Sequence, residues 1–149
     1  MFNVSLEHRL ETREPILAVQ LKNYKFVVVI SSYKGKIVLS RHKNRTTWET
    51  QGGHIETGEN TLEAAKRELY EESGATIFII TPAFDYWTCD KIGEANGMVF
   101  IAEIKEFTSI PDSEMEEIAF FDELPSNLTY PEITPVLFLE AQNMKKVSL

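Results

Sequence analysis

One segment constrains the fold of this chain more than any other, "QGGHIETGENTLEAAKRELYEESGA", which runs from Gln51 to Ala75. A glycine pair opens the segment, and a short, strongly specified helix closes it. Asn60 can cap the helix, and Glu63, three positions later, completes a capping-box pattern. Gly74 supplies the left-handed residue that commonly ends a helix. The segment therefore predicts a helix between Asn60 and Gly74.

The predicted helix has one apolar stripe and one acidic patch. At about 100° per residue, three side chains form the stripe that should face a sheet: Leu62, Ala65 and Leu69. Glu68, Glu71 and Glu72 fall within an adjoining arc of roughly 100°. Like charges three or four residues apart destabilise a helix slightly, so this patch needs a compensating interaction.

A bound cation is the compensation that the sequence favours. Carboxylates suit hard cations that prefer oxygen ligands, and Mg²⁺ or Mn²⁺ is the natural candidate. A turn at Gly52-Gly53 would let a backbone carbonyl approach the same ion, because glycine has no Cβ. A solvated acidic helix face is the alternative. A calcium loop is a weaker one, because no D-x-D-x-D-G sequence accompanies the glutamates.

The bulk composition limits the possible partners. The 149 residues, with a formal net charge of −8, fit one soluble domain over residues 1–149 and count against bulk nucleic-acid binding. The longest wholly apolar run, Phe26 to Ile30, is far shorter than the ~20 residues of a membrane helix, so no membrane partner is expected. Cys89 is the single cysteine, which excludes an intrachain disulfide and predicts a cytoplasmic location.

The remaining segments predict a mixed β-sheet flanked by two helices, an α/β (α+β) fold. Runs rich in β-branched residues predict strands at 16–21, 26–32, 36–42, 75–89, 98–104 and 116–121. We expect turns at Lys34-Gly35 and Asn96-Gly97, and an interruption of the fourth strand at Pro82. The spacing of Val136, Leu139 and Met144 predicts a C-terminal helix.

The acidic segment resembles the signature of a known family. Gly53 is followed by five residues, Glu59, seven residues and then Arg67-Glu68-Leu69-Tyr70-Glu71-Glu72-Ser73-Gly74. This resembles the box of the Nudix (MutT-like) hydrolases, G-x₅-E-x₇-R-E-U-x-E-E-x-G-U. "WETQGG" and "DSEMEEIAFFDELP" are similar to segments that flank the box. The resemblance runs from about Phe26 to Pro125 and implies the Nudix fold, a central mixed sheet sandwiched between helices.

Two positions depart from the pattern of the family. Gln51 stands where proline is usual, and we expect it only to loosen the turn. Ala75 ends the box where a larger aliphatic residue is usual, and we expect it only to trim a core contact. Neither position removes a charged group.

The resemblance implies metal-dependent hydrolysis of the pyrophosphate bond in a nucleoside diphosphate linked to another group. By that resemblance Glu71 and Glu72 are the principal metal ligands, joined by the Gly52 carbonyl. Glu68 either shares the metal or acts as general base. Arg67 is implied to orient a neighbouring glutamate, and Glu59 to be an outer partner of the site.

Residues outside the box complete the set of candidates. Some members of the family take a further ligand or base from a later loop, where Glu114 is preferred over Glu117; a plain acidic loop is the alternative. Arg41 and Arg45 belong to the densest basic patch and could contact substrate phosphates, although a solvated strand end is an alternative. Three aromatic residues after the box could stack on a base or belong to the core: Phe84, Tyr86 and Trp87.

The resemblance favours a MutT-like enzyme that converts a (deoxy)nucleoside triphosphate to monophosphate and pyrophosphate. ADP-ribose, dinucleoside polyphosphates and capped RNA remain alternative substrates. A catalytically silent, nucleotide-sensing module is an alternative of another class, although all four glutamates and the arginine of the box are present. A homodimer is possible.

Overall fold

The computed structural model of the chain describes residues 3–5, 23–89 and 94–147. Within these ranges the helices are α2 (Thr61–Ser73) and α3 (Thr134–Val147). The strands are β1 (Asn3–Ser5), β2 (Tyr24–Tyr33), β3 (Lys36–His42), β4 (Trp48–Glu49), β5 (Gln51–His54), β6 (Ala75–Cys89), β7 (Glu94–Phe107) and β8 (Met115–Phe121).

These strands form one mixed sheet that forks along β2. The main order is β1-β6-β7-β2-β3-β4, while β5 pairs with β2 and β8 pairs with β3. β2 pairs in parallel with β7 on one side. On its other side, residues 26–29 of β2 pair with β5, and residues 31–33 pair with β3. The fork therefore places the glycine pair of β5 beside the middle of the sheet.

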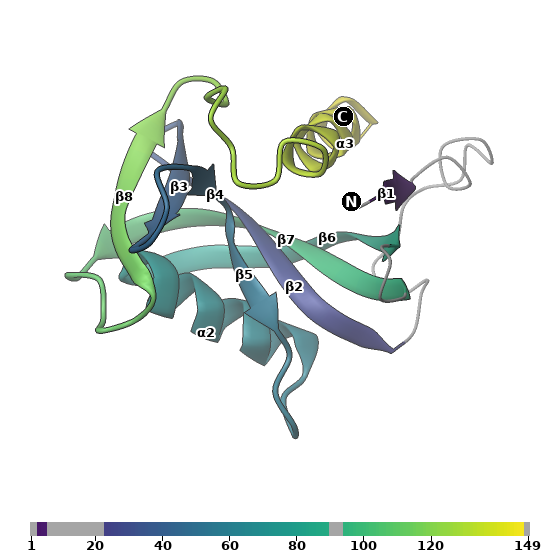
Figure 1. The fold of residues 1–149 in the computed structure, drawn as a ribbon, viewed down its shortest axis with the longest axis horizontal. Coiled ribbons are helices and arrows are strands. Elements are labelled where there is room, and N and C mark those ends of the chain that lie inside the picture. Colours follow the sequence, from purple (N-terminus) through teal and green to yellow (C-terminus); the bar gives the residue numbers. More distant parts are fainter. Residues whose placement is uncertain (1–2, 6–22, 90–93, 148–149) are drawn as a thin grey trace.

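A helix packs on each face of the sheet, as predicted (Figure 1). On one face, Leu69 of α2 packs with Val27 and Val29 in a core cluster. On the other face, Leu137 of α3 packs with Phe84 in a second cluster. Since successive strand residues point to opposite faces, β2 contributes side chains to both clusters. Full burial of a side chain such as Leu69 contributes about 2 kcal/mol.

The caps of α2 agree with the prediction, and its buried face is slightly rotated. Asn60 and Glu63 form both hydrogen bonds of a capping box, and Gly74 ends the helix in the left-handed conformation with φ 80°. The buried face comprises Ala64, Ala65, Leu69 and Ser73. Leu62 is predicted to be buried, but it is 38% exposed, because Ala64 rather than Leu62 faces the core at this end of the helix.

Three local predictions are wrong. The Gly52-Gly53 pair is not a turn, because it lies within strand β5 and pairs with β2. Asn96-Gly97 also lies inside a strand, β7, which continues to Phe107. Pro82 does not interrupt β6; instead, the pairing register shifts between Pro82 and Phe84. In each case pairing with a neighbouring strand overrides a local turn signal.

The other elements follow the sequence. Lys34 and Gly35 both have positive φ in the turn between β2 and β3. The C-terminal helix is present, although Leu139 is 58% exposed. Within the described ranges, neither helix has the length and apolar character needed to cross a bilayer. The strand predicted at 16–21 and the side chain of Cys89 lie outside what the structure describes.

Candidate active site

Glu72 lies at the centre of the acidic patch. It occupies the last turn of α2, and its Oε1 accepts a hydrogen bond of 2.7 Å from the backbone N–H of Gly52 on β5. Burial, together with the nearby charges of Glu68, Glu49 and Glu114, raises the pKa of Glu72 to about 9. Without a cation this carboxylic acid therefore holds its proton at neutral pH. A bound positive charge would favour the carboxylate instead.

Glu68 lies against the second glycine of the pair. A Cβ on Gly53 would fall 2.5 Å from Oε1 and 2.7 Å from Cδ of Glu68. The carboxylate therefore occupies space that only glycine leaves open. The Glu68 side chain is 12% exposed, and burial raises the pKa of this group as well.

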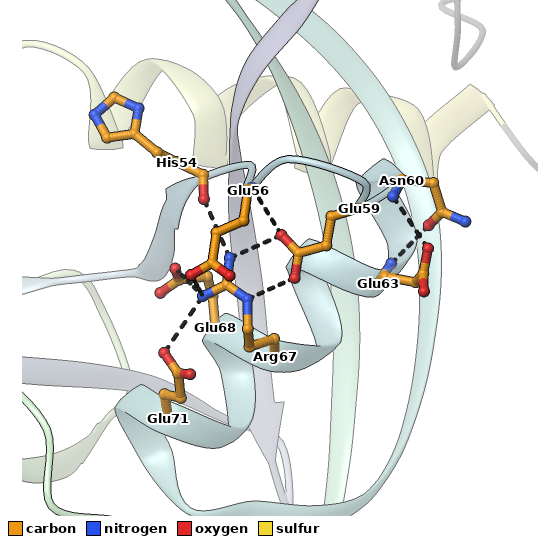
Figure 2. Close-up of polar contacts among 8 residues, drawn as sticks. All are labelled: His54, Glu56, Glu59, Asn60, Glu63, Arg67, Glu68 and Glu71. Atoms are coloured by element: carbon orange, nitrogen blue, oxygen red, sulfur yellow. Dashed lines mark hydrogen bonds and ion pairs between the residues drawn. The ribbon is translucent and has the colours of Figure 1, made fainter.

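Arg67 organises the acidic side chains around it (Figure 2). Its guanidinium donates two hydrogen bonds of 2.6 and 2.9 Å to Glu59 and one of 2.7 Å to Glu68. It also lies 3.4 Å from Glu71 and donates to the carbonyl of His54. This pairing lowers the pKa of Glu59 to about 2. Arg67 thus contacts Glu68, its neighbour in the box, directly.

We expect Arg67→Lys to lower the melting temperature by about 3–10 °C at pH 7, because lysine cannot form the bidentate grip on Glu59. The folded-state pKa of Glu59 lies below its ordinary value of 4.5. Its contribution to stability is therefore present above pH 4.5 and is lost as pH falls toward 2. Melting curves from pH 6 to 2 should show a shallower loss for Arg67→Lys than for wild type. Parallel curves would contradict the pairing.

Glu49 belongs to this site and was missed by sequence reasoning. It lies on β4, is 8% exposed, and contributes to the raised pKa of Glu72. Its Oε2 accepts a hydrogen bond of 3.2 Å from Arg45. Sequence alone does not reveal that Glu49 is buried, because its burial depends on the pairing of the two-residue strand β4 with β3.

The predicted basic and loop residues lie at the edge of the site, where each has a polar partner. Arg41 donates to Glu117 at 2.8 Å, which makes Glu117 a surface ion-pair partner in this structure. Arg45 hydrogen-bonds with Tyr130, and this contact raises the pKa of Arg45. The Glu114 side chain is 83% exposed and lies 3.7 Å from His42. Glu114 is near enough to affect the pKa of Glu72.

Two of the aromatic candidates belong to the core. Phe84 is fully buried, and Tyr86 is 3% exposed in the cluster beneath α3. These two side chains are therefore not available to stack on a base, because α3 covers them. Trp87 is only partly buried.

Comparison with known proteins decides the family. A model of the NUDIX domain matches residues 22–135, which is most of the chain. The chain belongs to the Nudix hydrolase family. YtkD of Bacillus subtilis, which carries a provisional name as an 8-oxo-dGTP diphosphatase, is 33% identical over 106 residues. The RNA pyrophosphohydrolase of Bartonella clarridgeiae is 29% identical over 132 residues.

The coverage of these relatives differs. The match to YtkD covers 70% of this chain and 66% of YtkD. The match to the Bartonella protein covers 66% of this chain and 76% of that protein. The structure of the Bacillus subtilis pyrophosphohydrolase BsRppH superposes with a TM-score of 0.78 at 24% identity, over 98% of this chain and 90% of that one. This last similarity supports the Nudix fold.

The Nudix box residues fit a divalent cation of the Mg²⁺ type. Among the described residues, no three acidic, histidine or cysteine side chains meet as a complete metal cage. Mg²⁺ rarely uses such a cage, because it binds through one or two carboxylates and keeps waters or substrate phosphates as its other ligands. A buried Glu72 with a raised pKa, beside Glu68 in the space above Gly53, is a donor set of that kind.

Proposed function

We propose that this Nudix protein hydrolyses the pyrophosphate bond of a nucleotide with Mg²⁺ or Mn²⁺. The observation that carries the proposal is the buried carboxyl group of Glu72, held by Gly52 and surrounded by Glu68, Glu49 and Glu114. These clustered acidic groups destabilise the folded protein unless a cation binds beside them. A metal–nucleotide complex brings such charge together with phosphates.

We assign the principal metal-binding roles to Glu71 and Glu72, with the Gly52 carbonyl as a third donor. A divalent cation bound there supplies charge neutralisation at the phosphates and makes a bound water acidic near neutral pH. Glu68 is placed by Arg67 to hold or accept a proton from the attacking water, or to share the metal. Glu114 is the loop residue assigned to assist Glu68.

Arg45 is the best placed of the basic residues to meet substrate phosphate. Its guanidinium bridges the buried Glu49 and Tyr130, so it lies beside the acidic groups while 45% of its side chain is exposed. Arg41 contributes less, because its Nε already donates to Glu117. An arginine pair of this kind suits planar contacts to phosphate oxygens.

A (deoxy)nucleoside triphosphate is the substrate class we favour, with monophosphate and pyrophosphate as products. The provisional name of YtkD supports 8-oxo-dGTP as one member of the class. The name of the Bartonella relative supports the triphosphate end of RNA as the alternative. A cytoplasmic location, a single domain over residues 1–149 and a homodimer belong to the same proposal.

The test is product release from a substrate panel. Purified protein is incubated with dGTP, 8-oxo-dGTP, ADP-ribose, a diadenosine polyphosphate and a 5′-triphosphorylated RNA, each with Mg²⁺, with Mn²⁺ or with chelator. We expect metal-dependent release of pyrophosphate from at least one triphosphate and none with chelator. Nucleotide binding without turnover of any substrate would instead support the sensing module.

A further inference from the structure

Gln51 belongs to a buried hydrogen-bonded chain that crosses three strands. It is fully buried on β5, together with Ser31 on β2 and Ser40 on β3, which are 2% and 0% exposed. The Ser31 hydroxyl donates to Oε1 of Gln51 at 2.6 Å. The Gln51 amide donates to the carbonyl of Val38 at 3.2 Å and to Oγ of Ser40 at 3.0 Å. The side-chain amide therefore uses both its donors and its acceptor.

This series of hydrogen bonds ends on α2, the helix that carries the acidic residues. The Ser40 hydroxyl, which accepts from Gln51, donates to the backbone carbonyl of Glu72 at 2.8 Å. Glu72 is in the last turn of α2, where carbonyls have no partner within the helix. Ser40 thus supplies a partner that the helix itself cannot provide, and joins the last turn to the sheet.

Glu72 is consequently held at two points, by Gly52 of β5 and by Ser40 of β3. Its side chain accepts from the Gly52 N–H, while its backbone carbonyl is reached from Gln51 through Ser40. A residue whose side chain and backbone are both held loses less conformational freedom when it binds a ligand.

We propose that Gln51 is a positioning residue for Glu72, acting through Ser40 to set the site's affinity for a divalent cation. The proposal rests on the proposed function in assigning Glu72 to the metal. It reverses the expectation that Gln51 only loosens a turn. A proline at position 51, which is usual in the family, has no side-chain amide and cannot make these hydrogen bonds.

The obvious competing explanation is that the chain of hydrogen bonds only stabilises the fold. Buried polar groups are satisfied in any stable protein, and losing one partner costs stability wherever it lies. A positioning role predicts two further results. The Kd for the metal must rise in these variants but not in a control variant that only loses stability, and the effects of Gln51 and Ser40 on the Kd must overlap. Residues around a metal site typically change affinity 10- to 100-fold when removed.

The experiment compares Gln51→Met, Ser40→Ala and the double variant with wild type. Methionine keeps most of the glutamine volume and removes all three hydrogen bonds. Mn²⁺ alone is titrated into each protein and followed by electron paramagnetic resonance, while melting temperatures are measured without metal. The control is Tyr24→Phe, which removes a hydrogen bond of 2.8 Å to Asp85 elsewhere in the sheet.

We expect Gln51→Met and Ser40→Ala each to raise the Mn²⁺ Kd about tenfold, with the double variant no weaker than the weaker single variant. Tyr24→Phe should lower the melting temperature without changing the Kd. An unchanged Kd in Gln51→Met, or fully additive effects, would overturn the positioning role. Because the readout is metal binding, failure of every nucleotide to turn over would overturn the proposed function without deciding this question. If Gln51→Met fails to fold, Ser31→Ala provides the milder test of the same hydrogen-bonded chain.

Discussion

Glu72→Gln is expected to abolish turnover while making the metal-free protein more stable. Glutamine keeps an oxygen that can accept from the Gly52 N–H, so the local geometry of the site is preserved. It cannot supply the negative charge that a divalent cation requires. We expect a fall in kcat of at least about 10³-fold, equivalent to about 4 kcal/mol of activation free energy.

The stability gain follows from the pKa of Glu72. Its folded-state pKa of about 9 lies above the ordinary value of 4.5, so the folded state binds the proton more tightly than the unfolded state. The favourable effect of the proton is fully present below pH 4.5 and is lost as pH rises toward 9. Glutamine does not titrate. At pH 8 we expect Glu72→Gln to gain about 1–3 kcal/mol, or roughly 3–10 °C in melting temperature.

Thermal melts at pH 5 and pH 8, with chelator and with Mn²⁺, would measure this effect. Wild type should lose stability between the two pH values with chelator and regain it with Mn²⁺, because a ligand that binds only the folded state stabilises it. Glu72→Gln should show a smaller change in both, because Glu68, whose pKa is also raised, is still present. Glu116→Gln is the matched control, since it removes one exposed charge from β8. A similar gain in the control would assign the effect to net charge.

The local signals of the acidic helix were sufficient to predict it. Its start, its end and its acidic arc depend on interactions within a few residues, namely the Asn60–Glu63 capping box and the left-handed Gly74. The Nudix box also contains the acidic residues that pair with Arg67. In the structure, Arg67 forms ion pairs with Glu59, Glu68 and Glu71. Such spacing along one helix is fixed by 3.6 residues per turn.

Features that depend on strand pairing were not readable in the same way. Glycine pairs are common in turns, and only pairing with β2 shows that Gly52-Gly53 is extended strand. A Cβ on Gly52 would collide with the carbonyl of Val27, so its requirement for glycine comes from a neighbouring strand. The burial of Glu49 and Gln51 likewise depends on contacts with distant segments.

Gly53→Ala is expected to impair catalysis with little effect on stability. The added methyl would fall 2.5 Å from Oε1 of Glu68, which is closer than such contacts allow. The flexible carboxylate can move away, so the fold survives while the catalytic geometry does not. A displacement of about 1 Å can cost 10²-fold in rate, and we expect a fall in kcat of that size.

Gly35→Ala supplies the opposite control. Gly35 has a positive φ of 82° and no atom within 4 Å of an added Cβ, so alanine there strains the backbone without touching the site. We expect it to lower the melting temperature and leave kcat unchanged. Glu68→Gln sets the scale, because Gly53→Ala should lose no more activity than removal of the charge itself. Loss of both stability and activity in Gly53→Ala would show that β5 moved. Selective loss of activity would show that Gly53 is needed because it leaves space for the Glu68 carboxylate.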